Sequence, residues 1–187
     1  MNYYIDLFSP ETYKAFSEST QDTSGFRPKQ EAIAKTISIG DRLICYVTRL
    51  SRFVGVLEVT SKYYINDSPI FFTSEDPFCV RFKVKPVVWL PLDKAIPIYD
   101  KQVWDHLSFT GEGRSWTAMV RSSLRAFRKE DGEYLNLILQ QQSSALKTYP
   151  LTEDDEKKLR PHKVKTHKSQ DVMVSVPDDE DEAVLNK

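Results

Sequence analysis

The sequence of 187 residues contains little cysteine, histidine or glycine, with 2 Cys, 3 His and 6 Gly. Two cysteines are too few for a disulfide framework or for a four-cysteine zinc site. Both Cys45 and Cys79 lie in segments with the composition of strands, so we expect buried free thiols. The composition therefore excludes a small secreted domain held together by disulfides.

Long apolar runs are also missing. A membrane-spanning helix needs about 18 or more consecutive apolar residues, and no such run occurs. The first residues, MNYYIDLF, include the acid Asp6 and do not have the pattern of a secretory signal. We therefore expect a soluble protein of a reducing compartment, the cytoplasm, without a membrane partner.

Motifs of the common catalytic sites are absent. Neither G-x-S-x-G, G-x-x-x-x-G-K-[ST] nor H-E-x-x-H occurs. Two of the histidines, His162 and His167, lie in a lysine-rich stretch, far in sequence from the cysteines that could complete a metal site. We expect no metal, no cofactor and no catalytic residue, so that the folded part binds a ligand without transforming it.

Charge is distributed unevenly along the chain. Residues 1–150 carry 19 Lys and Arg against 17 Asp and Glu, whereas residues 151–187 carry 7 against 10. The second part has a basic block over residues 157–168, an acidic run over residues 178–182 and hardly any aromatic residue. Such a segment cannot bury enough apolar surface to fold alone. We therefore expect one domain over residues 1–148 and a charged, disordered tail or linker over residues 149–187.

The remaining pattern is that of an α+β domain. Ser9 followed by Pro10 predicts a short helix that ends near Ser19. Apolar and β-branched residues predict an extended N-terminal segment followed by a compact set of antiparallel strands, over residues 2–8, 40–47, 52–64, 78–90 and 95–98. Two further helices are expected, over residues 28–36 and 130–142.

Two segments of this pattern carry further information. The stretch VRFKVK alternates, which predicts a half-buried strand with Val80, Phe82 and Val84 toward the core and Arg81, Lys83 and Lys85 toward water. The segment 116–127 is ambiguous, because its apolar residues fit a helical face about as well as an irregular strand.

A basic and aromatic stretch between Gly113 and Lys129 is the clearest binding signal. It contains five cations and no acid, and two aromatic residues are interleaved with them: Arg114, Arg121, Arg125, Arg128 and Lys129 with Trp116 and Phe127. A guanidinium neutralises phosphate and a ring stacks on a base, so the stretch suits an unpaired or flipped nucleotide. The alternative is that the two rings belong to the core and that the arginines are its solvated rim.

Read in order, a series of short motifs resembles the EVE domain, a member of the PUA-like superfamily of small β-barrels related to the YTH and ASCH domains. The motifs are GF at 25–26, GDxxxxY at 40–46, FVGVLEV from 53, Tyr63 and Tyr64, PFCVRFKV from 77, IPI at 96–98, LSFT at 107–110, the Trp116 and Arg121 pair, and Asp131. The resemblance covers about residues 2–145. Two features depart from the family pattern: Arg27, Pro28 and Lys29 follow the GF motif, and Arg128 stands where a hydroxyl would cap the last helix.

The resemblance implies a small PUA-like barrel of mixed and antiparallel strands with short flanking helices, and residues 116–122 as its final strand. It also implies a pocket that accepts a modified base from DNA or RNA. The residues expected to form the base pocket are Phe26, Tyr46, Thr48, Ser108, Phe109, Trp116 and Arg121. The residues expected to bind phosphate are Arg27, Arg49, Arg52, Arg114 and Arg125.

The basic turn TRLSR, between the strands LICYV and FVGVLEV, is open to two interpretations. In the first, Thr48, Arg49 and Arg52 form a loop at the mouth of the barrel, where their cations meet a nucleic-acid backbone. In the second, the turn is an ordinary solvated hairpin.

The resemblance favours a non-catalytic reader of modified nucleobases, in particular of 5-modified cytosine in DNA. Similar domains accompany modification-dependent restriction nucleases, which implies a nuclease partner or a fused nuclease domain. Two alternatives are an RNA-binding PUA-like protein and an enzyme that processes nucleotides in a PUA-like pocket. The enzyme would need a general acid or base beside the aromatic residues, and the candidates are Asp41, Glu58, Asp105 and His106.

Overall fold

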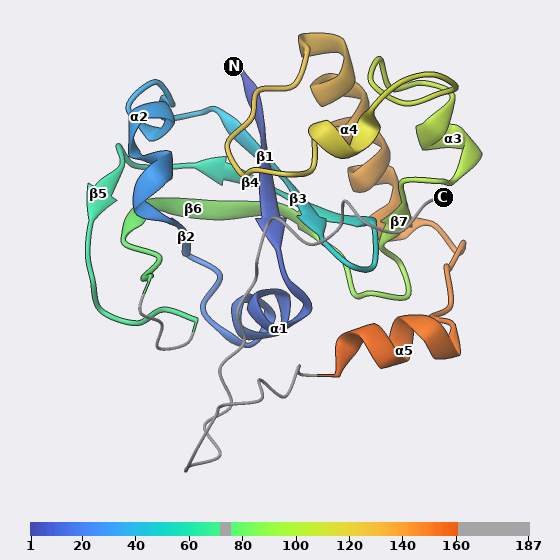
Figure 1. The fold of residues 1–187 in the computed structure, drawn as a ribbon, viewed down its shortest axis with the longest axis horizontal. Coiled ribbons are helices and arrows are strands. Elements are labelled where there is room, and N and C mark those ends of the chain that lie inside the picture. Colours follow the sequence, from blue (N-terminus) through green and yellow to red (C-terminus); the bar gives the residue numbers. More distant parts are fainter. Residues whose placement is uncertain (72–75, 161–187) are drawn as a thin grey trace.

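The computed structural model describes residues 1–71 and 76–160 and shows a curled, mixed half-barrel with short helices around it (Figure 1). The strand order is β1-β3-β4-β6-β2, with β5 paired to β6 and β7 paired to β4. The fold is α+β, as expected. The strands are β1 Tyr3–Phe8, β2 Thr23–Phe26, β3 Arg42–Val47, β4 Arg52–Val59, β5 Tyr64–Ile65, β6 Val80–Trp89 and β7 Ile96–Pro97.

The pairing of β1 makes the sheet mixed. β1 runs parallel to β3, with Tyr3 opposite Arg42 and Phe8 opposite Val47, whereas every other pair of these strands is antiparallel. A parallel pair needs a long crossover, which here holds α1, β2 and α2. The crossover returns the chain across the barrel opening, so the GF motif at the end of β2 lies near the end of β1.

The predicted helices are confirmed with small shifts. Helix α1 is Pro10–Glu18, with the Ser9 hydroxyl accepting a hydrogen bond from the Thr12 amide and proline at the first turn. The expected helix over 28–36 is a 3-10 turn, η1 Pro28–Gln30, followed by α2 Glu31–Ala34. Helix α4 is Lys129–Ser144, slightly longer than predicted, and α3 Lys101–Trp104 was not predicted.

The prediction of a final strand over residues 116–122 is wrong. Those residues form the 3-10 turn η2, Trp116–Ala118, and a series of bends. The edge of β1 is covered instead by the next residues along the chain. The Ile5 amide donates to the Arg125 carbonyl at 2.9 Å, and the Leu124 amide donates to the Ile5 carbonyl at 2.7 Å. Leu124 has a positive φ of 64°, a rare conformation for leucine, and its side chain is buried.

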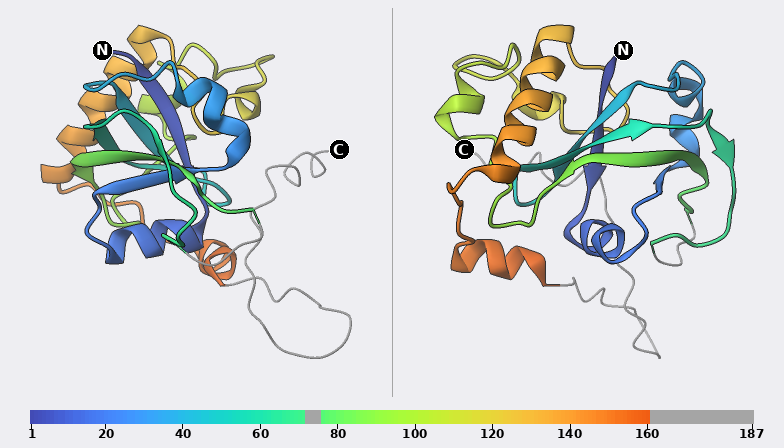
Figure 2. Two further views of the ribbon diagram at one scale, coloured as in Figure 1. Left: turned by 90° about the vertical axis from the view of Figure 1, so that its left-hand side faces the viewer. Right: turned by 180° about the vertical axis from the view of Figure 1, so that it is seen from behind.

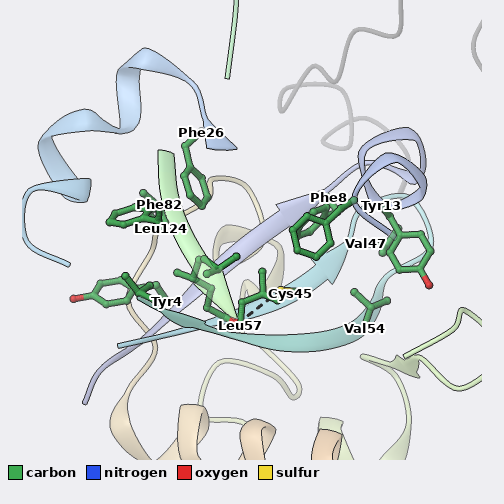
Figure 3. Close-up of a cluster of buried hydrophobic side chains, with 14 of the residues drawn as sticks. Tyr4, Phe8, Tyr13, Phe26, Cys45, Val47, Val54, Leu57, Phe82 and Leu124 are labelled. Carbon is green, nitrogen blue, oxygen red and sulfur yellow. Dashed lines mark hydrogen bonds between the residues drawn. The ribbon is translucent and has the colours of Figure 1, made fainter. Parts of the chain in front are cut away.

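The sheet separates two hydrophobic clusters. Successive side chains of a strand point to opposite faces, so β1, β3 and β4 contribute to both. The concave cluster includes Phe8, Phe26, Phe82 and Leu124, and Figure 3 shows these side chains converging inside the curl of the sheet. The outer cluster is covered by α4, which lies across the sheet from α2 (Figure 2). The pocket described below opens beside the concave cluster.

Burial confirms one sequence prediction and corrects another. Cys45 and Cys79 are buried free thiols, as expected. Arg81 is buried instead of facing water, because β5 and the loop before β6 cover that edge. Its guanidinium donates to the carbonyl of Phe78 at 2.9 Å and to the carbonyl of Ser68. Lys83 and Lys85 are exposed, as the alternation predicted.

Regular structure continues past residue 148, where we expected the tail to begin. Helix α5, Glu153–Leu159, starts with a capping box between Thr152 and Asp155 and packs against α1. Leu159 contacts the concave cluster. Residues 161–187, which include most of the expected tail, lie outside the described residues. Among the helices of the described part of the chain, none is long and apolar enough to cross a membrane.

Candidate functional site

A pocket lies where the end of β1, the start of α1, the end of β2 and the turn after β3 meet. This is the edge at which the crossover brings β2 back toward β1. The pocket is lined by Leu7, Ser9, Thr12, Gly25, Phe26, Arg27, Lys29, Gln30, Thr48, Phe78 and Ser123. No aspartate or glutamate is among these residues.

Hydroxyl groups form much of the polar wall, and the backbone fixes them. The Ser9 hydroxyl accepts from the Thr12 amide at 3.1 Å, and the Ser123 hydroxyl accepts from the Leu7 amide at 3.1 Å. The Thr48 hydroxyl donates to the Phe8 carbonyl at 3.2 Å. A hydroxyl can donate once and accept twice, so each group retains hydrogen-bonding capacity for a ligand. The wall is therefore polar and rigid without carrying charge.

Two phenylalanine rings and two cations complete the pocket. Phe26 is buried and packs edge-on against Phe82, with ring centroids 6.0 Å apart. Phe78 is half-buried, and the Arg27 guanidinium lies 4.0 Å from the centre of its ring. Arg27 also pairs with Asp76 at 3.5 Å. The rim thus combines a flat ring, a stacked guanidinium and the ammonium group of Lys29.

Gly25 is required by the close packing behind the pocket. A Cβ atom there would lie 2.4 Å from Cδ1 of Ile70 and 3.1 Å from both Cβ and the carbonyl oxygen of Phe78. Any side chain would therefore require Ile70 to move and Phe78 to shift slightly. The glycine of the GF motif is thus explained by the close approach of the segment with Ile70 and Phe78 to strand β2.

A buried acid, Asp6, lies in β1 next to the pocket residue Leu7. The Ser24 hydroxyl donates to the Asp6 carboxyl at 2.7 Å. Burial raises the pKa of Asp6 to about 7, and the hydrogen bond from Ser24 acts in the opposite direction. The pKa of the neighbouring Cys45 thiol is raised well above its ordinary value. Burial is the main cause, and the charge of Asp6 is the second. Neither group lines the pocket.

The four candidates for a general acid or base lie elsewhere. Asp41 accepts hydrogen bonds from the amides of Asn2 and Ser38, and Glu58 pairs with Arg42 at 3.8 Å. The remaining two, Asp105 and His106, follow α3; the first pairs with Lys101 and the second stacks on Tyr134. None of the four lines the pocket. Among the described residues, no group of three His, Cys, Asp or Glu side chains could hold a metal ion.

The structure brings only part of the predicted base pocket together. Phe26 and Thr48 line the pocket, and Arg27, predicted to bind phosphate, lies beside them. Tyr46 is buried in the outer cluster, where its ring lies 5.0 Å from that of Phe53. Its strand neighbours Cys45 and Val47 face the concave side instead, so the alternation of β3 directs Tyr46 away from the pocket.

The LSFT and tryptophan motifs lie on the outer side of the sheet. Ser108 donates its amide and its hydroxyl to the Asp131 carboxylate at 2.8 and 2.5 Å, which ties the LSFT turn to the start of α4. Phe109 packs near Phe127. Trp116 forms a surface cluster with Tyr99 and Trp104, at centroid distances of 5.4 and 6.2 Å. None of the predicted residues Ser108, Phe109 and Trp116 lines the pocket.

The basic turn after β3 serves mainly to hold other parts of the chain. Arg49 has a positive φ of 63° and pairs with Glu11 of α1 at 3.4 Å. Arg52 is buried and donates to the carbonyls of Leu92, Tyr149 and Pro150 and to the carboxylate of Asp155. Thr48 alone faces the pocket. The structure thus answers why cations stand between two core strands: they fix α1 and the C-terminal segment.

The last three predicted cations lie in the segment before α4. Arg114 is exposed and donates to the Ser108 carbonyl. Arg121 and Arg125 are exposed on either side of the pocket residue Ser123. The lining residues missed from the sequence are Leu7, Ser9, Thr12, Gly25, Lys29, Gln30, Phe78 and Ser123. Gly25 belongs to the GF motif and Lys29 lies three residues after it, so the position of the motif could have suggested both as lining residues.

Comparisons with known proteins agree with this architecture. The family model of the EVE domain matches residues 2–135. The chain belongs to the EVE domain family. The match includes every residue that lines the pocket and ends within α4. No curated protein matches the chain.

Several solved structures share the EVE domain's fold at low sequence identity. The YTH domain-containing protein mmi1, solved as an RNA complex, is 14% identical over 74% of this chain and 80% of its own, with a TM-score of 0.52. The YTH domain of Zygosaccharomyces rouxii MRB1, solved with N6-methyladenosine RNA, is 11% identical over 79% and 90%, with a TM-score of 0.52. A hypothetical protein from Leishmania major is 15% identical over 76% and 97%, with a TM-score of 0.50.

Proposed function

We propose that this EVE domain binds nucleic acid by accepting one modified nucleobase, flipped out of its stack, in the pocket between β1, α1 and β2. The observation that carries the proposal is the lining of that pocket. It combines aromatic rings, fixed hydroxyls and cations, and it contains no carboxylate. Rings stack on a planar base, hydroxyls pair with its edge, and cations neutralise the adjoining phosphate.

The size of the pocket indicates how a base would enter. The cavity of about 50 Å³ holds only a few water molecules, so a purine or pyrimidine needs more room. Arg27 and Lys29 are long side chains on the rim, and Arg27 would have to leave its contacts with Asp76 and Phe78 to admit a base. Phe26 and the hydroxyl wall are held by the core and the backbone. We therefore expect the rim to move and the inner wall to keep its geometry.

The polymer and the modification are finer parts of the proposal. The sequence resemblance favours 5-modified cytosine in DNA, with a nuclease as partner. The similarity in fold to the Zygosaccharomyces rouxii YTH domain, which was solved with N6-methyladenosine RNA, supports including RNA and methylated adenine among the ligands to be tested. In both cases a small substituent on a flat ring is recognised by the shape of the pocket and by polar pairing.

An enzymatic role has less support than binding. General acid–base catalysis needs a titratable group within hydrogen-bond reach of the substrate. The lining residues offer hydroxyls, an amide and cations, and the candidate acids identified from the sequence have other partners. A non-catalytic reader is therefore the function that the pocket supports best.

A binding panel tests the proposal. Short single-stranded and duplex oligonucleotides of DNA and RNA would carry one central base, either unmodified, 5-methylcytosine, 5-hydroxymethylcytosine or N6-methyladenosine. We expect one modified form to bind at least about tenfold more tightly than its unmodified counterpart. Equal affinity for every modified and unmodified pair would contradict the proposal.

Variants locate the selectivity. Phe78→Ala removes the half-buried ring from the pocket wall and is expected to bring the ratio of modified to unmodified affinity close to one. Thr48→Val keeps the shape of the side chain but removes its hydroxyl, and should lower the ratio less. Tyr99→Ala is the aromatic control, because Tyr99 is 61% exposed and does not line the pocket. A ratio that survives both pocket substitutions would place recognition elsewhere.

A further inference from the structure

The arginines of the domain fall into two groups. Residues 1–150 contain nine arginines. Six of them have hydrogen-bonding or ionic partners within the described chain: Arg27, Arg42, Arg49, Arg52, Arg81 and Arg114. The other three are Arg121, Arg125 and Arg128, and none of their side chains makes a hydrogen bond or ion pair with a described residue. All three lie within eight consecutive residues, which we call the arginine strip (121–128).

The arginine strip begins at the pocket. Ser122 accepts a hydrogen bond from the amide of the pocket residue Gln30 at 2.8 Å, and Ser123 lines the pocket itself. From there the strip follows the outer edge of β1 to the start of α4, with the Phe127 amide donating to the Tyr3 carbonyl at 2.9 Å. In the chain, Arg121 and Arg125 therefore stand on either side of the pocket residue Ser123, and Arg128 follows further along the same edge of β1.

Burial fixes which side chains of the strip face water. Leu124 and Phe127 are buried, at 1% and 8% exposure, and they anchor the backbone to both hydrophobic clusters. The three arginines are exposed. The anchors hold the backbone that carries them. No described carboxylate forms an ion pair with any of the three.

We propose that Arg121, Arg125 and Arg128 bind the phosphates of the strand that leads away from the flipped base, along the edge of β1 toward α4. This inference rests on the proposed function of the pocket and adds the path of the polymer. Guanidinium is suited to phosphate because its planar fork of donors matches the phosphate oxygens. An exposed, unpaired arginine also loses no existing partner when it binds. The three residues carry no base-specific contact in this arrangement, so they supply affinity and direction, not selectivity.

Salt dependence of binding measures these contacts. Each phosphate that a cation neutralises in a single strand adds about 0.7 to the slope of log Kd against log salt. Arg121→Gln, Arg125→Gln and Arg128→Gln should each lower this slope by about 0.7, and the triple variant by about 2. The probe is a short unmodified single-stranded oligonucleotide, measured by fluorescence anisotropy at several salt concentrations. Lys101→Gln is the control, because it removes one exposed charge that pairs with Asp105 on α3.

The outcomes separate this inference from the proposed function. Both modified and unmodified oligonucleotides should lose affinity by the same factor in the arginine variants, so the ratio between them stays unchanged. If the wild-type protein shows no modified-base preference but the slopes fall as expected, the pocket proposal fails and the arginine strip stands. If the preference exists but the slopes equal that of wild type, the strip does not bind phosphate.

An acidic protein partner is the rival occupant of the strip. The chain's own run Asp178–Glu182 supplies such a sequence, although it lies outside the described residues. A synthetic peptide of residues 176–184 should fail to displace the oligonucleotide at micromolar concentration. Displacement by the peptide, together with tighter oligonucleotide binding after the five acids are neutralised, would overturn the assignment to nucleic acid.

Discussion

Arg52 and Arg125 carry the same guanidinium group, and from the sequence both were expected to bind phosphate. In the structure Arg52 is 5% exposed and its side chain has four hydrogen-bonding partners, whereas the side chain of Arg125 is exposed and has none among the described residues. Three of the partners of Arg52 are backbone carbonyls, two of them in the segment that leads to α5. One arginine joins two parts of the fold, and the other is available to a ligand.

The difference shows that the role of a cation is decided by its surroundings. A charge removed from water is costly unless hydrogen bonds and an opposite charge replace the lost solvation. Arg52 meets this condition, so its removal should affect stability. Arg125 remains solvated, so its removal should affect only what it binds. Three substitutions test this contrast, from the largest expected effect to the smallest.

The largest effect is expected at Asp6, a buried carboxyl group with the Ser24 hydroxyl as its hydrogen-bond partner. Burial raises the pKa of this carboxyl from 3.8 to about 7. The folded protein therefore retains the proton that the unfolded chain loses, and the contribution of Asp6 to stability is fully present below pH 3.8 and is lost as pH rises toward 7. The shift corresponds to about 4 kcal/mol, at about 1.4 kcal/mol per unit.

Asp6→Asn removes this titration while keeping an acceptor for Ser24. The measurement is urea unfolding of both proteins between pH 4 and 8, followed by tryptophan fluorescence. The free energy of unfolding of the variant should rise relative to that of wild type up to about pH 7, and the difference between the two should be constant above that pH. A difference that does not change with pH would mean that Asp6 is ionised in the folded protein and has a stronger partner.

The second effect concerns Arg52. Arg52→Met keeps much of the side-chain volume but leaves the Asp155 carboxylate and three carbonyls without their donor. We expect a loss of about 3 kcal/mol in the free energy of unfolding, and faster hydrogen exchange in α5. Asp155→Asn, which removes only the charge of the partner, should cost about 1 kcal/mol. Equal stability of Arg52→Met and wild type would show that the buried contacts contribute nothing net.

The smallest effect is expected at Arg125. Arg125→Met should change the free energy of unfolding by no more than about 0.5 kcal/mol, because the side chain is exposed and has no partner among the described residues. Thermal unfolding by circular dichroism measures this directly. A loss comparable to that of Arg52→Met would mean that Arg125 supports the edge of β1 and would remove the contrast between the two residues.

Much of the fold could be predicted because its signals are local. The Ser9 and Pro10 cap, the alternation along β6 and the apolar spacing of α4 each depend on a few neighbouring residues. Phe26 of the GF motif, predicted to belong to a base pocket, lines the pocket in the structure. The segment 116–128 was harder, because its conformation depends on pairing with β1 at the opposite end of the chain. Its apolar residues fitted a helical face about as well as an irregular strand, and in the structure the segment is neither.

The candidate site was predicted only in part, because its residues come together through contacts between distant parts of the chain. Thr48 and Phe26 were assigned to the pocket, but Tyr46 lies across the sheet, and Ser108, Phe109 and Trp116 lie near α4. A motif identifies residues that a family keeps together in sequence, and it does not state which face of the sheet each one occupies. The hydroxyls of Ser9 and Ser123, more than a hundred residues apart, could not be joined without the fold.

By itself the sequence determined the kind of molecule: an α+β EVE domain with buried thiols, and a basic, aromatic stretch before its last helix. Periodicity, caps and motif order are properties of neighbouring residues and survive without coordinates. Tertiary structure alone decided which arginine side chains are paired and which rings line the pocket. These features depend on which residues, far apart in the sequence, contact one another away from solvent. The crossover between the parallel strands β1 and β3 sets that arrangement.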